Sequence, residues 1–257
     1  MVLLFYEILL GLLIFIAGAC MFSFLNVIIY RVPRHMSFIK GFSMCPSCGH
    51  RLRAGDLVPV LSYLLLKGKC RYCKKSIGMR DTVIELLGGG AALLCAANYK
   101  EWPAALTVFL FFSVLTVTAL IDADTMEIPD GCWIALAALA AVSVFTMDGV
   151  SIPSRIIGMI CVSVPMLLVT LIVREAFGGG DIKLTAAAGL FLGWKLMLVS
   201  GAMAVFLGGG YGIFLLASGK KKRKDHFAFG PFLCVGMAAG ILYGQPLIDW
   251  YLSFLLY

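Results

Sequence analysis

Charged residues are scarce in this chain. Asp, Glu, Lys and Arg make up 14% of its 257 residues, whereas soluble globular proteins carry about 25%. Apolar residues reach 61% of the chain, and the mean hydropathy is +0.97. This composition excludes a soluble enzyme, a disordered chain and a fibrous repeat. It predicts a protein whose transmembrane segments take up most of the sequence.

Long stretches with almost no charge locate these segments. About 20 apolar residues are needed to cross ~30 Å of hydrocarbon. Seven stretches approach or exceed that length, namely residues 8–30, 82–99, 103–121, 131–147, 156–173, 196–219 and 227–248. An eighth stretch, 184–194, is shorter. A turn near residues 193–195 would make it a separate pass and would return the basic run 220–224 to the cytoplasm, as the positive-inside rule requires. The sequence therefore predicts an all-α polytopic membrane protein with about eight transmembrane helices.

The distribution of Lys and Arg gives the orientation. With eight passes and the N-terminus outside, 18 of the 21 Lys and Arg residues face the cytoplasm, and Lys100, Arg155 and Lys195 lie in outer loops. The N-terminal stretch lacks the basic region and cleavage pattern of a signal peptide. We therefore expect 1–30 to be a retained first helix, 31–80 a cytoplasmic loop and 81–257 a membrane domain of about seven helices.

The loop contains two C-x2-C pairs separated by 21 residues, Cys45 with Cys48 and Cys70 with Cys73. Two such knuckles are typical of a structural zinc site, in which four thiolates surround the ion. Disulfides are disfavoured because the cytoplasm is reducing. A loop with few large apolar residues would also need the metal in order to fold. The other five cysteines stand singly in apolar segments and are interpreted as packing residues.

Acidic residues mark the candidate chemistry. Four carboxylates fall within nine residues where the third predicted span ends, at Asp122, Asp124, Glu127 and Asp130. Further along, Gly178, Gly179 and Gly180 precede Asp181 at the predicted start of a helix, at membrane depth, where an ionisable group is expensive. Asp122 and Asp181 are predicted on the same face of the membrane. Two adjacent carboxylates that share a proton can hydrolyse a peptide bond, as in aspartic proteases.

Other interpretations of these residues stay open. Asp181 alone would serve as a helix cap, and the two aspartates would also suit the cation or proton site of a transporter with a zinc-bound cytoplasmic loop. A structural or assembly role is a further alternative. The glycines lack the G-K-[ST] ending of a phosphate loop. The basic run 220–224 favours contact with anionic membrane lipids over nucleic acid, because no nucleic-acid-binding fold accompanies it.

A series of motifs resembles one known family along nearly the whole chain. In order, they are 23–27 (SFLNV), 30–33 (YRVP), the four-cysteine loop with 59–63 (PVLSY) and 67–70 (KGKC), 81–88, 121–130, 178–184 (GGGDIKL) and 229–232 (FGPF). The chain resembles the type IV prepilin peptidases, GxGD-type aspartic proteases that also act as N-methyltransferases in the bacterial cytoplasmic membrane. One departure is Phe22, where the family usually has glycine.

The resemblance implies residue roles and a substrate. Asp122, eight residues before Asp130, and Asp181 take the places of the catalytic aspartates. The implied substrate is a pilin-like precursor of pili, secretion pseudopili or DNA-uptake machinery, cut after glycine between a short basic leader and an apolar helix. We hypothesise that Asp124 and Glu127 attract the leader.

The resemblance also implies S-adenosylmethionine as methyl donor, since relatives with the cysteine loop usually methylate. No sequence motif identifies its binding site. Residues 88–90 (GGG) are better explained by helix packing. The oligomeric state cannot be inferred from the sequence.

Overall fold

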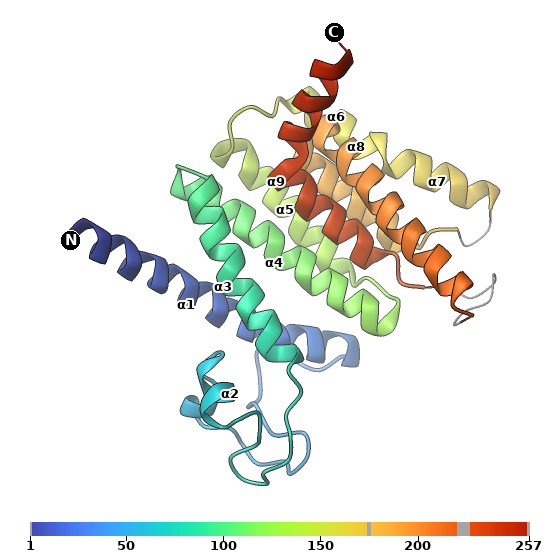
Figure 1. Cartoon of the computed structure of the whole chain (residues 1–257). Coiled ribbons are helices and arrows are strands. Elements are labelled where there is room, and N and C mark those ends of the chain that lie inside the picture. Colours follow the sequence, from blue (N-terminus) through green and yellow to red (C-terminus); the bar gives the residue numbers. More distant parts are fainter. Residues whose placement is uncertain (1, 174–175, 220–226, 256–257) are drawn as a thin grey trace. The chain divides into compact units, whose positions relative to one another are not determined.

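The computed structural model describes residues 2–173, 176–219 and 227–255. These residues form helices, and their β-structure is limited to two isolated bridges in the cysteine loop. The predicted all-helical membrane fold is thereby confirmed (Figure 1). The basic run 220–224, which was used to assign the topology, lies outside the described residues. The chain divides into two compact units, Met1–Phe109 and Leu110–Tyr257.

The described residues include five stretches that are each long and apolar enough to span a membrane. They are Val2–Arg34, Trp102–Thr125, Ile152–Ile172, Gly179–Ala217 and Gly230–Phe254. The predicted count of eight passes therefore depends on two shorter helices and on a division of Gly179–Ala217, which is described below.

In the first unit, two helices pack against each other and flank the cysteine loop. They are α1 (Val2–Arg31) and α3 (Arg80–Asn98), and the loop contains short helical turns at Val32–Arg34, Ala54–Asp56 and α2 (Leu61–Leu65). Both α1 and the loop thus belong to the same unit as α3. The predicted division of the chain at residues 30 and 80 therefore remains a proposal about which segments carry which function.

Glycines of α3 accept aromatic side chains of α1. Phe22 is 1% exposed, and a Cβ atom on Gly88 would overlap its ring. A Cβ atom on Gly89 would lie 2.5 Å from the Phe15 ring, whereas one on Gly90 would meet nothing within 4 Å. The unusual Phe22 thus fills the space that Gly88 leaves open, and helix packing explains the first two glycines of the run.

We expect Gly88→Ala to destabilise the protein by about 1–3 kcal/mol, because an added methyl group overpacks a filled site. Gly90→Ala is the matched control on the same helix. The melting temperature of the purified protein in detergent measures the effect. Phe22→Ala in the Gly88→Ala background should recover part of the loss, because it removes the overlapping ring. Equal stability of Gly88→Ala and Gly90→Ala would contradict the packing described here.

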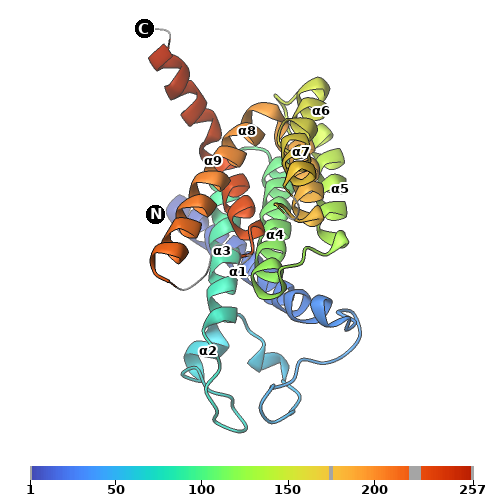
Figure 2. The ribbon, with the colours of Figure 1, turned by 90° about the vertical axis from the view of Figure 1, so that its right-hand side faces the viewer.

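The second unit contains the end of α4 (Trp102–Thr125) and five further helices. These are α5 (Asp130–Thr146), α6 (Ile152–Cys161), α7 (Ser163–Ile172), α8 (Gly179–Ala217) and α9 (Gly230–Leu255). Helices α5, α6 and α9 all pack against α8 (Figures 1 and 2).

The span predicted at 156–173 begins earlier, at Ile152, and is divided at Val162. Pro165 explains the division, because proline cannot donate a hydrogen bond to the carbonyl of Cys161 and its ring crowds that carbonyl.

Helix α8 reverses direction at Gly193, where the sequence predicted a turn. Gly193 has φ 75° and ψ 167°, a conformation that favours glycine. Near the end of α8, Gly208 lies against Phe229, and Phe229 lies 5.5 Å from Phe177, just before α8 begins. The start of α8 and Gly208 therefore lie near each other, so the two halves of α8 run in opposite directions.

Arg155 stabilises this reversal from inside the unit. The sequence placed Arg155 in an outer loop, but it lies in α6 and is 4% exposed. Its Nη1 donates to the carbonyls of Leu190 and Phe191 over 3.0 and 3.4 Å. It also donates to Ser143 Oγ, 2.6 Å away, near the end of α5. The turn at Gly193 interrupts the helical pattern, and Arg155 satisfies carbonyls that would otherwise be buried without a partner.

Candidate active site

Asp122 lies in the last turn of α4 and is 5% exposed. Its Oδ2 accepts a hydrogen bond from the backbone N–H of Gly230, 3.0 Å away. Gly230 is the first residue of α9 and is followed by Pro231, which suits the first turn of a helix because it needs no donor there. The start of α9 therefore holds the carboxylate at the end of α4.

Asp181 lies in the first turn of α8, whose N-cap is Gly178. Its Oδ2 accepts a hydrogen bond from the Gly178 backbone N–H over 3.3 Å, which is a helix-capping contact. The other oxygen, Oδ1, is buried and has no hydrogen-bond partner among the described residues. Because a buried polar atom normally has a partner, Oδ1 is suited to bind a ligand or water.

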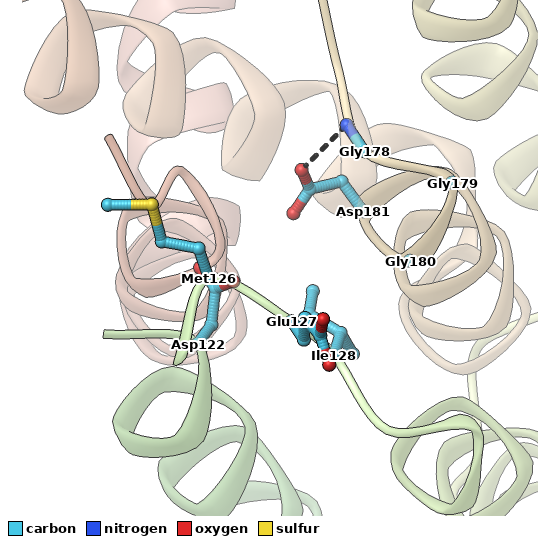
Figure 3. A pocket seen from close by; sticks show the side chains of 8 residues that line it. All are labelled: Asp122, Met126, Glu127, Ile128, Gly178, Gly179, Gly180 and Asp181. Carbon is cyan, nitrogen blue, oxygen red and sulfur yellow. Dashed lines mark hydrogen bonds between the residues drawn. The ribbon is translucent and has the colours of Figure 1, made fainter. Parts of the chain in front are cut away.

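The two aspartates line one cavity of 330 Å³. The remaining lining comes from Met126, Glu127 and Ile128 after α4, and from Gly178, Gly179 and Gly180 before Asp181. Figure 3 shows the two carboxylates reaching this space from separate chain segments. The structure thus brings together the two residues that the sequence singled out, 59 positions apart in the chain.

The backbone on both sides of the cavity is closely fitted. Met126 has φ 56° and donates its N–H to the Asp122 carbonyl over 2.8 Å, which ends α4 and directs the next residues along the cavity. Across from them, a Cβ atom on Gly180 would lie 2.9 Å from Ile128 Cβ. A Cβ atom on Gly179 would meet nothing within 4 Å. Of these two glycines, Gly180 is the one that the packing requires.

The two acids proposed to attract a leader peptide are placed differently. Glu127 is exposed and belongs to the cavity lining, whereas Asp124 is exposed outside that lining. Of the two, Glu127 is therefore the one positioned to contact a chain bound in the cavity.

A polar cluster beside the cavity connects the start of α5 to the start of α8. Lys183 Nζ lies 2.8 Å from Asp130 Oδ1, which also accepts a hydrogen bond from Trp133 Nε1 over 2.7 Å. Both charged side chains are more than half exposed, so the ion pair contributes little stability. The sequence analysis noted Lys183 and Asp130 as parts of motifs but gave no reason to pair them. Gly230 was likewise noted only as part of a motif.

The four loop cysteines form a second candidate site. Their sulfur atoms all lie within 4.8 Å of one another, and Cys45 Sγ is 4.0 Å from Cys73 Sγ. A tetrahedron with Zn–S bonds of about 2.3 Å places its sulfurs about 3.8 Å apart. The residues present therefore fit a zinc ion that the chain would hold with four thiolates.

Both knuckles have the same backbone hydrogen bonds. The N–H of Cys45 donates to His50 and that of Gly49 to Cys45, while the N–H of Cys70 donates to Lys75 and that of Lys74 to Cys70. The residues four places after each first cysteine, Gly49 and Lys74, both have positive φ, 67° and 60°. This repeated turn presents two sulfurs from each knuckle.

Polar groups around the knuckles organise the loop and its thiols. The backbone N–H groups of Ser47 and Cys48 lower the pKa of the Cys45 thiol to about 6. Arg71, inside the second knuckle, donates its Nε–H over 2.6 Å to Oδ1 of Asp56, which lies between the two knuckles. This contact holds the pKa of the Asp56 carboxyl below its usual range. Tyr72 donates its hydroxyl to the other oxygen of Asp56, so the second knuckle is tied to the middle of the loop.

Comparisons with known proteins agree with the motifs. The family model described as "Bacterial Peptidase A24 N-terminal domain" matches residues 16–99. The model described as "Type IV leader peptidase family" matches residues 109–213. No solved structure matches significantly.

Several curated relatives are named prepilin leader peptidase/N-methyltransferase. The protein from Burkholderia pseudomallei is 30% identical over 261 residues, covering 90% of this chain and 84% of the relative. The Bacillus subtilis protein is 30% identical, with 94% and 97% covered. The Neisseria gonorrhoeae protein is 31% identical, with 86% of each covered. The chain belongs to the type IV leader peptidase family and is a multi-pass protein of the bacterial inner membrane.

Proposed function

We propose that this protein is a membrane-embedded aspartic endopeptidase and N-methyltransferase. It removes the short basic leader of type IV prepilin-like precursors at the cytoplasmic face of the membrane and then methylates the new N-terminus. The observation that carries the peptidase assignment is the meeting of Asp122 and Asp181 at one cavity. The names of the curated relatives support the same substrate and both activities.

The proposed reaction uses the aspartates as a pair that shares one proton. The ionised carboxylate takes a proton from water, and the resulting hydroxide attacks the scissile carbonyl carbon. The protonated carboxyl donates its proton to the carbonyl oxygen. Collapse of the tetrahedral intermediate breaks the C–N bond and returns a proton to the leaving amine. Backbone donors from Gly230 and Gly178 each hold one carboxylate oxygen, which fixes the reacting oxygens.

Mass spectrometry of a prepilin-like precursor tests both activities. The precursor is incubated with the protein in membranes and with S-adenosylmethionine. Loss of the leader and addition of one methyl group to the product support the proposal. A stable, folded protein that leaves every pilin-like precursor intact would favour the alternative of a cation- or proton-coupled transporter.

The cysteine loop is assigned a structural role in methylation. Cys45, Cys48, Cys70 and Cys73 would hold Zn²⁺ with no open coordination position, so the ion stabilises the loop and does not activate water. This role is consistent with the limited regular structure of 31–80, because metal binding then supplies folding free energy. S-adenosylmethionine is the methyl donor, as the N-methyltransferase names of the relatives imply.

Cys48→Ser is expected to remove the bound zinc and the methyltransferase activity while cleavage persists. Cys48 is exposed, so serine is tolerated sterically and only the metal ligand is lost. The measurements are zinc content by elemental analysis and the two product masses. Cys20→Ser, at an exposed cysteine of α1, is the matched control. Full methylation by a zinc-free Cys48→Ser protein would remove the proposed role of the metal.

Reversing the charge of both Asp124 and Glu127 to Lys is expected to raise KM for the precursor several-fold with little change in kcat, because attraction of the basic leader is lost. The single Glu127→Lys variant should account for most of the change, since Glu127 alone of the two lines the cavity. Steady-state kinetics at low ionic strength measure KM for each variant. An unchanged KM in the double variant would eliminate leader attraction by these acids.

The membrane orientation follows from the distribution of charge and is part of the proposal. The N-terminus lies outside, and the cysteine loop and both aspartates lie on the cytoplasmic side. The basic run 220–224 would then meet the anionic lipids of the inner leaflet.

A further inference from the structure

An apolar groove of 450 Å³ lies in the second unit, between α7 and the second half of α8. We call it the α7–α8 groove. Its walls include Val162, which directly precedes α7, Met166 and Val169 of α7, and Gly201, Ala202 and Val205 of α8. No charged residue lines it within the described part of the chain. Figure 1 shows α7 running in a different direction from the second half of α8.

The groove ends beside the catalytic cavity. Two of its lining residues are Phe177 and Phe229, whose ring centroids lie 5.5 Å apart. Phe177 directly precedes Gly178, which lines the cavity, and Phe229 directly precedes Gly230, whose N–H donates to Asp122. The two aromatic rings therefore separate an acidic cavity from an apolar groove that starts next to it.

The length of the groove and the small residues that line it suit the binding of a helix. From Leu198 to Val205 the groove follows α8 for about 10 Å, or about two helical turns, at about 1.5 Å per residue. Gly201 is buried and Ala202 is exposed in the groove. Small residues at such positions allow two membrane helices to approach closely.

The order of these surfaces on the protein matches the order of the chemically distinct segments along the proposed substrate. A precursor has a basic leader, a scissile bond and an apolar helix, and the protein has acidic Glu127, the two aspartates and the apolar groove. We propose that the α7–α8 groove binds the first turns of the precursor's apolar helix, directly after the scissile bond. This inference rests on the proposed function and adds a binding subsite to it. The bound helix holds the scissile bond at the aspartates and leaves the leader at Glu127.

Filling the groove tests the inference. Ala202→Trp places a large side chain in the groove at an exposed position. Leu207→Trp is the matched control, because Leu207 is an exposed residue of the same helix outside the groove lining. Two substrates are compared in detergent. One is a precursor with its complete apolar helix, and the other is a short peptide that ends a few residues after the scissile bond.

For the precursor, Ala202→Trp should raise KM at least about tenfold, which corresponds to about 1.4 kcal/mol. For the short peptide, kcat/KM should stay within about twofold of the wild-type value, and Leu207→Trp should change neither substrate. Wild-type kinetics of Ala202→Trp on the precursor would overturn the inference, as would an equal loss on both substrates. If the wild-type protein cleaves neither substrate, the proposed function itself fails.

Photocrosslinking gives a readout that does not depend on turnover. Phe206 lines the groove and is 81% exposed, so it is replaced by benzoylphenylalanine in an Asp122→Asn background that leaves the precursor uncut. We expect crosslinks to the first turns of the precursor's apolar helix. Crosslinks only to lipid, or to a second copy of this chain, would assign the groove to that occupant and overturn the inference.

Discussion

Replacing either Asp122 or Asp181 with Asn is expected to lower kcat for precursor cleavage by at least about 10³-fold. The amide keeps the size of the side chain but can neither take a proton from water nor donate one as a carboxylic acid. Asparagine can still accept the backbone hydrogen bonds from Gly230 and Gly178 that the structure shows. Both variants should therefore fold, remain in the membrane and keep zinc in the cysteine loop.

The matched control for these variants is Asp124→Asn. Asp124 lies two residues after Asp122 at the same helix end, but outside the cavity lining. It should keep kcat near the wild-type value and affect at most KM. Cleavage by mass spectrometry, thermal unfolding and zinc content are measured on all three variants. Appreciable turnover by either Asn variant at Asp122 or Asp181 would refute the two-aspartate mechanism, and full activity of both would favour a structural role for these residues.

Much of this arrangement could be predicted because it depends on local patterns. Scarcity of charge identifies membrane helices, and the two C-x2-C pairs determine which four sulfurs converge. The glycines before Asp181 predict a helix start with the carboxylate in its first turn, where the structure has it. The turn in α8 was predicted from charge parity, and Gly193 adopts the positive φ there.

The features that could not be predicted depend on contacts between distant segments. The sequence gives no local signal that Gly230 donates to Asp122 from 108 residues away. Similarly, Lys183 pairs with Asp130 only because the starts of α5 and α8 lie side by side. Arg155 was counted as an outer-loop charge, because hydropathy alone cannot show that buried carbonyls compensate for a buried guanidinium.

Gly230→Ala is the second substitution that we expect to lower kcat strongly. A Cβ atom at this position would lie 2.6 Å from Asp122 Oδ2, which is closer than ordinary van der Waals contact allows. Gly230→Ala therefore pushes the carboxylate away from the N–H that now holds it at 3.0 Å. Displacement of a reacting group by about 1 Å costs about 10²-fold in rate. We expect a loss of that size in kcat, with little change in KM, because the substitution leaves Glu127, which we propose attracts the leader, and the α7–α8 groove untouched.

Three alanine variants of glycines at the cavity distinguish this effect from a general need for flexible glycines. Gly179→Ala should keep near wild-type activity, because its Cβ would meet nothing within 4 Å. Gly180→Ala should be intermediate, because its Cβ would press on Ile128, which lines the cavity, and not on a carboxylate. Thermal unfolding of each variant shows whether lost activity reflects lost folding. If Gly230→Ala is folded and as active as Gly179→Ala, the position of the Asp122 carboxylate seen here is not the one that supports catalysis. If activity decreases in the order Gly179→Ala, Gly180→Ala, Gly230→Ala, then the contact made by the added methyl group determines the loss. The loss is largest where the methyl group displaces the Asp122 carboxylate, as expected if this carboxylate reacts at the cavity.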